Sequence, residues 1–474
     1  MKHSKRAEGL YCNPLSIPDY PRGVDHPDRK HMEDYRSLAD PTAIYYEGKW
    51  YVYPSYGMAF VTEDFVNWEH HPVQPENIGY APTVLEYRGK FYLLACGSHL
   101  YCGDTPLGPF EDIGSLRLPD GHEFTVKDPM LFADDDGSVY LYWGIGDPGI
   151  FGAKLDSENL CQLVTEPKIL FSFNPEHVWE RFGDHNQELG RSSLEGSWMF
   201  KRNGRYYLTY TGPGTCYRTY GMGCYISDIG PLDGFRYQPH NPILQNTSGL
   251  VKGPGHGCIV EGPNHTLWAF YTCVLCYAHK FERRIGVDPA GIDEDGNLFV
   301  RGSSDIPQLA PGMIPHPENG NDSSLLPLTF SNPVETSSCA EGHSAVYALD
   351  ESMLSWWQPA AGDPEKELIV DLRAYYQVSA IRIIWRDIGL DYNAGILPGP
   401  FRYRVDGCLE EQEETRKWIP LLDASDNDMD LAVDFRTFAA RKVRYVRLKI
   451  LGTPMEIEPG VISFTAFGTY DHRL

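Results

Sequence analysis

The chain has 474 residues, of which 42% are hydrophobic and 13% aromatic. That content supports sizeable packed cores and excludes a disordered polypeptide. Lys and Arg number 41 and Asp and Glu 65, which gives a formal net charge of −24. A surface this acidic repels phosphate groups, so neither nucleic acid nor an anionic membrane is expected as a partner.

The N-terminal residues 1–8 are basic, but no apolar stretch follows them, so we expect no secretory signal and a cytoplasmic location in a bacterial cell. No apolar run approaches the roughly 20 residues that a membrane span needs. The 11 cysteines fit buried, reduced thiols. Cys273 and Cys276 form a C-x-x-C pair, but no second pair completes a zinc site.

One pattern recurs five times along the first 300 residues. A head residue, usually followed by Pro or Gly, begins an apolar stretch; a turn at Gly or Asn follows, and then an aromatic-rich strand. The five units cover residues 40–53, 81–94, 128–142, 195–209 and 256–271. Each unit predicts a β-hairpin, and the material between hairpins fits two further strands. The repeat therefore predicts an all-β, five-bladed β-propeller over residues 1–315.

The composition changes after the last hairpin. Residues 316–335 are rich in Pro, Ser, Gly and Asn and have no period, which predicts a linker. Alternating strands resume in residues 336–474, most clearly at 368–372, 378–385 and 443–450. This tail predicts a second all-β domain, a β-sandwich of jelly-roll type.

The head residues carry the chemistry. In a propeller the innermost strands line the central channel, so the heads should form a ring around it. The heads are Asp40, Ala81, Asp128, Glu195 and His256. Three of them are carboxylic acids, and crowding such groups shifts their pKa values apart. Hydrolysis of a glycosidic bond needs one protonated and one ionised carboxyl. A structural role as turn caps before Pro or Gly explains one such acid more easily than three in register.

These residues resemble a known family. Asp40-Pro41, Asp128-Pro129 and Glu195-Gly196, each at the start of a blade, look like the three signatures of glycoside hydrolase family 43. Ala81-Pro82 resembles the second-blade motif of that family. The resemblance implies an inverting enzyme with Asp40 as general base, Asp128 as the orienting and pKa-modulating acid, and Glu195 as general acid. It also implies an oligosaccharide substrate, mostly an arabinofuranoside or xyloside, with galactosides as the alternative.

The same resemblance concerns two further residues. It implies that His256 lies near the channel axis, where it contacts substrate or holds a calcium ion through waters, although calcium prefers oxygen ligands. It places a sugar-contacting arginine near Arg283. No cofactor is otherwise required. Glu188 does not head a hairpin and ranks below Glu195 as the acid. The loop 134–137 resembles a calcium loop but fits a solvated turn better.

Two other functions remain open. One is a non-catalytic carbohydrate-binding propeller, which would have no need of all three acids. The other is a retaining, fructan-acting propeller enzyme, whose Asn-Asp-Pro motif is not matched by the Ala39-Asp40-Pro41 sequence. Four aromatic residues could stack on a sugar: Trp68, Tyr80, Trp143 and Trp198.

The tail resembles the discoidin-like (factor V/VIII type C) sandwich of many carbohydrate-binding modules. The matching segments are 348–350, 355–357, 368–372 and 443–448. Such a domain either binds carbohydrate or only buttresses the propeller. We expect four of its aromatic residues to pack on the propeller: Trp356, Trp357, Tyr375 and Tyr376. The oligomeric state is left open.

Overall fold

The computed structural model describes residues 5–18, 36–75, 78–274, 281–387, 389–390, 399–410, 412 and 415–470. These residues are almost entirely β-strand and loop, with a few short 3₁₀ helices: η2 (Val178–Glu180), η3 (Pro263–His265), η4 (Pro317–Asn319), η5 (Ala345–Ala348) and η8 (Pro454–Glu456). None of the helices in this part of the chain is long and apolar enough to cross a membrane. Cys276 of the C-x-x-C pair lies outside the described residues, whereas Cys273 is buried.

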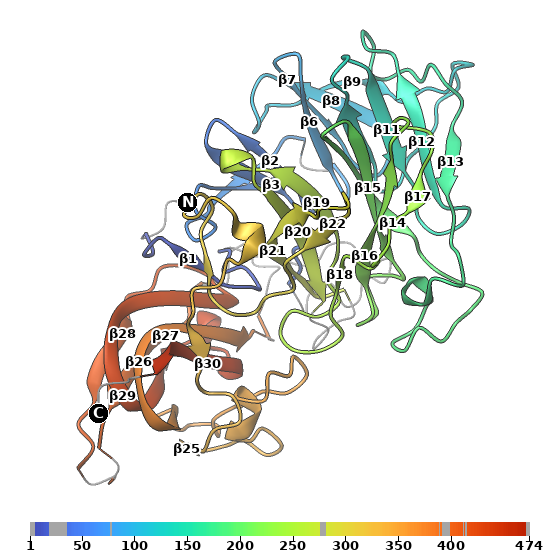
Figure 1. Cartoon of the computed structure of the whole chain (residues 1–474). Helices are drawn as coiled ribbons and strands as arrows, with labels where there is room; N and C mark the ends of the chain where they lie inside the picture. Colours follow the sequence, from blue (N-terminus) through green and yellow to red (C-terminus); the bar gives the residue numbers. More distant parts are fainter. Residues whose placement is uncertain are drawn as a thin grey trace.

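The propeller is confirmed, with five blades of consecutive antiparallel strands (Figure 1). The first and second blades comprise β2 (Thr42–Tyr46), β3 (Lys49–Tyr53), β4 (Met58–Thr62) and β5 (Glu69–Pro72), then β6 (Thr83–Tyr87), β7 (Lys90–Leu94), β8 (His99–Gly103) and β9 (Glu111–Ser115). The third comprises β10 (Met130–Ala133), β11 (Val139–Trp143), β12 (Ile150–Leu155) and β13 (Lys168–Phe171). The fourth comprises β14 (Glu195–Arg202), β15 (Arg205–Gly212), β16 (Gly221–Ser227) and β17 (Arg236–Tyr237), with β18 (Leu244–Gln245) also paired to β16. The fifth comprises β19 (Gly255–Glu261), β20 (Leu267–Val274), β21 (Arg283–Ile292) and β22 (Leu298–Val300).

The turns explain why these segments form hairpins. Glu47-Gly48, Arg88-Gly89 and Asn203-Gly204 each place two successive residues at positive φ. A two-residue turn of this kind matches the right-handed twist of the strands that it joins. The aromatic strands then pack blade against blade. Trp50 of the first blade meets Trp268 of the fifth edge to face, with ring centroids 6.4 Å apart, so aromatic side chains fill the space between blades.

A short two-stranded sheet joins the beginning and the end of the propeller. In it β1 (Leu10–Tyr11) pairs with β23 (Gln308–Leu309), so that Leu10 lies opposite Leu309. The N-terminal segment 5–18 also runs along the fifth blade, where the Leu15 amide donates to the Ile285 carbonyl at 2.8 Å. The ring is therefore held by strand pairing as well as by side-chain packing.

The C-terminal domain is the predicted β-sandwich. Its strands are β24 (Leu326–Pro327), β25 (Val334–Thr336), β26 (Glu367–Arg386), β27 (Arg402–Cys408), β28 (Ile419–Ala424), β29 (Val433–Gly452) and β30 (Gly460–Tyr470). The two long strands β26 and β29 pair along both of their halves, with a register shift between the halves. One half of the pair carries β27 and β25, and the other carries β30. β24 falls inside the segment 316–335 and β25 begins in it, so this segment already contributes strands to the sheet.

The two domains lie side by side (Figure 1), and apolar side chains form part of the contact between them. Leu250 of the propeller joins a buried cluster with Met353, Ile384, Val433 and Ile462 of the sandwich. A second cluster brings Cys12 against three buried sandwich residues, Ala380, Phe435 and Phe467. An apolar inter-domain contact makes two domains behave as one unit of stability.

The prediction that four aromatic residues of the sandwich pack on the propeller is mostly wrong. Trp357 is fully buried in the sandwich's own core, and Tyr376 packs against that same core. Tyr375 is 39% exposed. Only Trp356 packs on the cluster that contains Leu250. Successive side chains of a strand point to opposite faces. In β26 the side chains that join the apolar clusters with the propeller are aliphatic, those of Ala380 and Ile384, and not the aromatic pair.

Candidate active site

A pocket of about 200 Å³ opens where the first strands of the blades begin. It is lined by Asp40, Tyr80, Asp128, Ile145, Glu195, Thr215, His256, Phe281 and Arg283. All five residues that the sequence marked for catalysis or substrate binding are in this set, and they come from the first, third, fourth and fifth blades. The structure therefore brings them together around one small volume.

The entry to each blade has the same unusual backbone. Asp40, Ala81, Asp128 and His256 have φ values of 53°, 49°, 49° and 35°. In the fourth blade Gly196 takes this conformation, with φ 59°, and Glu195 precedes it. Non-glycine residues at positive φ are uncommon and cluster at functional sites. Four of the five head residues, all except Ala81, line the pocket.

Three of these bends are fixed by a side chain from the preceding blade. The amide of Asp40 donates to the Thr272 hydroxyl at 2.9 Å, and the amide of Ala81 donates to the Ser55 hydroxyl at 3.0 Å. The amide of Asp128 lies 3.1 Å from the Cys96 sulfur. Thr272 belongs to the fifth blade, Ser55 to the first and Cys96 to the second. The fifth, first and second blades thus each fix the position of the head residue of the next blade.

Asp40 is held as a carboxylate. Arg283 Nη1 lies 3.2 Å from Oδ1, Ser55 donates to Oδ2 at 2.7 Å, and His256 Nδ1 lies 3.4 Å from Oδ1. Burial alone would raise the pKa of Asp40. The Arg283 guanidinium, His256 and the Ser55 hydroxyl outweigh burial and hold this pKa below its usual value.

The pKa of Glu195 is shifted in the opposite direction to that of Asp40. Burial raises the pKa of Glu195 to about 7, and the nearby charge of Asp40 adds to the rise. Tyr220 donates to Oε1 at 2.7 Å and Ser193 donates to Oε2 at 3.0 Å, and these hydrogen bonds act against the rise. Thr211 Oγ1 donates to the Glu195 carbonyl at 3.0 Å. Glu195 is therefore fixed at both carboxyl oxygens and at its backbone, and it retains a proton near neutral pH.

Asp128 is the third buried carboxyl. Burial, followed by the charges of Glu195 and Asp40, raises its pKa well above the usual value. The Cys96 thiol, whose own pKa burial raises, donates to Asp128 Oδ1 at 3.5 Å. His256 Nδ1 lies 3.7 Å from Asp128 Oδ2. Asp128 thus lies beside His256 and close enough to the other two acids for their charges to act on it.

His256 connects Asp40 and Asp128 through one ring nitrogen. Burial lowers the pKa of His256, so the ring is neutral, and its Nδ1 faces both carboxyls. Calcium takes six to eight oxygen ligands, as a rule. Within the described ranges no group of three His, Cys, Asp or Glu side chains is arranged to hold a metal ion. The donor set around His256, one ring nitrogen and the carboxyls of Asp40 and Asp128, does not fit direct calcium coordination.

The other sequence candidates lie elsewhere. Glu188 is exposed and does not line the pocket. Of the four aromatic candidates only Tyr80 lines it, since Trp143 and Trp198 are buried in apolar clusters. In the loop 134–137, Asp134 accepts hydrogen bonds from Lys201 and Tyr206 of the fourth blade, so this loop joins two blades.

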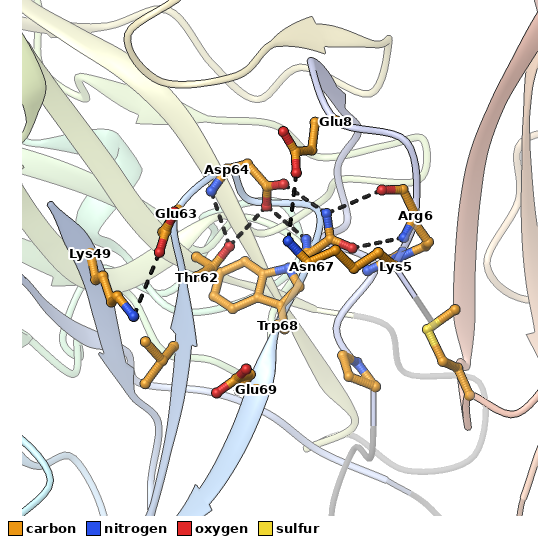
Figure 2. Close-up of a pocket in the computed structure, with 13 residues that line it drawn as sticks. Lys5, Arg6, Glu8, Lys49, Thr62, Glu63, Asp64, Asn67, Trp68 and Glu69 are labelled. Atoms are coloured by element: carbon orange, nitrogen blue, oxygen red, sulfur yellow. Dashed lines mark hydrogen bonds and ion pairs between the residues drawn. The ribbon is translucent and has the colours of Figure 1, made fainter. Parts of the chain in front are cut away.

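A larger cavity of about 470 Å³ lies at the junction of the first blade, the N-terminal segment and the sandwich (Figure 2). Trp68 forms part of its wall and is only 5% exposed, which leaves little ring surface for stacking on a sugar. Its other walls include Met429, which precedes β29. The three buried acids are not part of this cavity.

Sequence reasoning missed the groups that orient the acids. Ser55, Cys96, Ser193 and Tyr220 contact the three carboxyls but lie outside the head positions. A usable signal exists for two of them. Ser55 and Cys96 are small polar residues at the same distance after Asp40 and Ala81, just beyond the aromatic strand of their hairpins.

A five-bladed propeller whose small pocket holds three buried carboxyls, one ionised and two with raised pKa values, defines a glycoside hydrolase. Comparison with known proteins gives the same class. Residues 36–298 match the family described as Glycosyl hydrolases family 43. The chain belongs to this family.

Related proteins extend the comparison. A β-xylosidase from Xylanibacter ruminicola is 26% identical over 329 residues, which cover 55% of this chain and 95% of the relative. A xylosidase/arabinosidase from Bacteroides ovatus is 24% identical over 341 residues, covering 58% of this chain and 97% of the relative. A β-D-galactofuranosidase, xynD, from Aspergillus niger is 24% identical over 269 residues, covering 49% and 73%.

Solved structures match the fold. A thermostable family-43 glycoside hydrolase has a TM-score of 0.50 and 22% identity, and the match covers 64% of this chain and 99% of that one. A mutant of the family-43 protein BlXynB from Bacillus licheniformis has a TM-score of 0.50 and 15% identity, covering 97% and 100%. The second match spans both domains, so an all-β, two-domain fold of this kind occurs elsewhere.

Proposed function

We propose that this protein is an inverting exo-glycosidase that removes terminal pentosyl residues, α-L-arabinofuranosyl or β-D-xylosyl, from oligosaccharides. The observation that carries the proposal is the opposed protonation of two carboxyls in one pocket. Asp40 has a lowered pKa and Glu195 a pKa of about 7. Near neutral pH the first accepts a proton and the second donates one, as glycosidic hydrolysis requires.

In the proposed reaction Asp40 takes a proton from a water molecule as the water oxygen bonds to the anomeric carbon. Glu195 gives its proton to the glycosidic oxygen as the bond from that oxygen to the anomeric carbon breaks. The products are two free sugars, with the configuration of the anomeric carbon inverted. Asp128 orients Glu195 and sustains its raised pKa. Room for the water requires the carboxyls of Asp40 and Glu195 to lie roughly 6.5–9.5 Å apart.

The size of the pocket supports action at a chain end. Pockets for drug-sized ligands hold about 300–1,000 Å³, and this one holds about 200 Å³, which suits one small sugar. Thr215 also lines the pocket, and its buried hydroxyl has no hydrogen-bond partner in the described part of the chain. The names of the relatives from X. ruminicola and B. ovatus favour a pentose.

The A. niger relative, named as a galactofuranosidase, supports a galactosyl substrate as the second candidate. A panel of para-nitrophenyl glycosides tests both. We expect hydrolysis of the α-L-arabinofuranoside or the β-D-xyloside, with the inverted anomer as the first product seen by NMR. Release of the retained anomer would contradict the inverting mechanism. Failure to cleave any member of the panel, or a matching oligosaccharide, would favour a binding protein.

A further inference from the structure

One arginine of the propeller reaches across to the sandwich. Arg36 lies four residues before Asp40 in the sequence, and its side chain is fully buried at the domain interface. Its Nε lies 2.9 Å from Asp387 Oδ2 and its Nη1 lies 2.7 Å from Asp430 Oδ2. Both aspartates belong to the sandwich, in the segments that follow β26 and precede β29. The start of the first blade is thus fixed to the second domain by two buried ion pairs.

The backbone around Arg36 also holds the beginning of β21. Arg284 Nη1 donates to the Arg36 carbonyl at 2.9 Å, and the Leu38 amide donates to the Arg283 carbonyl at 3.0 Å. Ser37 Oγ accepts a longer bond, 3.4 Å, from Arg283 Nε. Three successive residues, 36 to 38, therefore position the two arginines of β21 by their backbone and side chains.

Arg283 completes the connection, because its Nη1 lies 3.2 Å from Asp40 Oδ1. A continuous series of contacts runs from Asp387 and Asp430 of the sandwich through Arg36 and the segment 36–38 to Arg283 and the pocket. We propose that Arg36 is a positioning residue through which the sandwich sets the geometry of the Arg283–Asp40 pair, so that the second domain is part of the hydrolytic machinery. This proposal rests on the proposed role of Asp40 as the base.

Stability alone does not explain this arrangement. Removing charges from water costs several kcal/mol per ion, and an apolar contact of the same volume is often as stable as a buried ion pair. The same interface already has two apolar clusters. Unlike an apolar contact, a buried ion pair holds its two groups in one orientation. Here the two ion pairs of Arg36 fix the orientation of the segment 36–40, which ends in Asp40.

Another buried arginine crosses the interface and provides a matched control. Arg382 of β26 is as buried as Arg36 and donates to the Asn13 carbonyl at 2.7 Å. It also contacts Cys12 and Asp305, and among the described residues it makes no hydrogen bond or ion pair with the segment 36–40. Substitution of Arg382 therefore weakens the same interface without disturbing the contacts that lead to the pocket.

The test compares three variants of the full chain: the triple variant Arg36→Met with Asp387→Asn and Asp430→Asn, the conservative variant Arg36→Lys, and the control Arg382→Met. The triple variant removes Arg36 together with both carboxylates that it contacts. Arg36→Lys keeps the charge but cannot make both contacts from a planar group. kcat and KM are measured on the para-nitrophenyl glycoside that the panel identifies, together with Tm and the pH profile.

We expect the triple variant to lower kcat by about 10- to 100-fold, because displacement of a catalytic group by about 1 Å can cost about 100-fold. Arg36→Lys should give a smaller loss, and Arg382→Met should stay within about twofold of the unaltered enzyme at a similar loss of Tm. In the Arg36 variants the acidic limb of the pH profile, which reports protonation of Asp40, should move up by about 0.5–1 pH unit. The reason is that Arg283 lowers the pKa of Asp40, an opposite charge being worth about 1–3 units, and a displaced Arg283 lowers it less. The charged or titratable groups that face Asp40 are Arg283, His256, Asp128, Glu195 and Tyr220.

An unchanged kcat and acidic limb in Arg36→Lys, or losses in the triple variant no greater than in Arg382→Met, would overturn the proposal. Asp40→Asn separates this failure from failure of the proposed function. If Asp40→Asn is inactive while the Arg36 variants behave like the control, only the positioning role is lost. If Asp40→Asn hydrolyses the substrate normally, the assignment of the base is wrong.

Discussion

Two cavities of this molecule differ in how they treat carboxyl groups. The larger one, at the domain junction, has a buried arginine, Arg6, but its carboxyls are not buried: Lys49 and Glu63 lie 3.6 Å apart and their side chains are 49% and 68% exposed (Figure 2). The smaller one buries three carboxyls around a single arginine and a neutral histidine. Exposed pairs are screened by water and contribute little, whereas buried acids that compete for few partners take different protonation states. Buried carboxyls, rather than volume, mark the catalytic cavity.

The largest effect should follow from removing the sandwich. A chain that ends at residue 325 exposes Leu250 and Cys12, which now contact the sandwich core, and removes both carboxylates from Arg36. We expect aggregated or inactive protein, measured by size-exclusion chromatography and by hydrolysis of the aryl glycoside. A soluble, monomeric propeller with normal kcat would show that the small cavity is independent of the interface.

The next effect concerns the acids themselves. Asp40→Asn, Asp128→Asn and Glu195→Gln should each lower kcat by about 10²–10⁴-fold, the usual contribution of a general acid or base. For Glu195→Gln the loss should be larger on an unactivated disaccharide than on the aryl glycoside, whose leaving group needs less protonation.

Two exposed carboxyls serve as controls for these variants. Glu188→Gln, just before the fourth blade, and Glu69→Gln, in the wall of the larger cavity, should stay within about twofold of normal activity, because exposed groups away from the reaction contribute little. Equal damage from Glu188→Gln and Glu195→Gln on a disaccharide would make the choice of acid wrong.

A smaller effect should appear at Tyr220. Glu195 must hold its proton to act as the acid, so activity falls as the pH rises through its pKa of about 7. Tyr220→Phe removes a hydrogen bond that stabilises the carboxylate, so this pKa rises and the alkaline limb moves to higher pH. A hydrogen bond of about 0.5–1.5 kcal/mol corresponds to a shift of about 0.4–1 pH unit. Tyr217→Phe, in the same loop but with no hydrogen bond to Glu195 among the described residues, should leave the limb in place. A downward shift in Tyr220→Phe would contradict this arrangement.

The smallest effect is expected in the larger cavity. Lys49→Gln and Glu63→Gln remove an exposed ion pair, so Tm should change by about 1 °C or less and kcat on the aryl glycoside should be unchanged. Calorimetry and steady-state kinetics measure both. If either variant lost activity on longer oligosaccharides but not on the aryl glycoside, the larger cavity would have a role in substrate binding. The two cavities would then differ less in function than we expect.

The propeller and its ring of head residues were predictable because both are local patterns. Asp40, Asp128 and Glu195 each open a hairpin, and repetition places them at equivalent positions around one axis. The groups that orient them were not predictable in the same way. Tyr220 reaches Glu195 across a loop, and the link from Arg36 to Asp430 joins residues on different domains. Such contacts depend on how blades and domains pack, which no short-range period encodes.

The pairing of Leu10 with Leu309 has a consequence for how the protein is made. At a synthesis rate of about 5–20 residues per second, the partner of Leu10 emerges about 15–60 s after Leu10 itself. During that time the blades can form their own hairpins, but the N-terminal segment has no strand to join. Its contact from Ser16 to the Val433 carbonyl, 2.8 Å long, must wait longer still. Residues 10–16 therefore reach their final partners only after residues 308–309 and 433 have been made, later than the synthesis of Arg283, the last residue that lines the pocket.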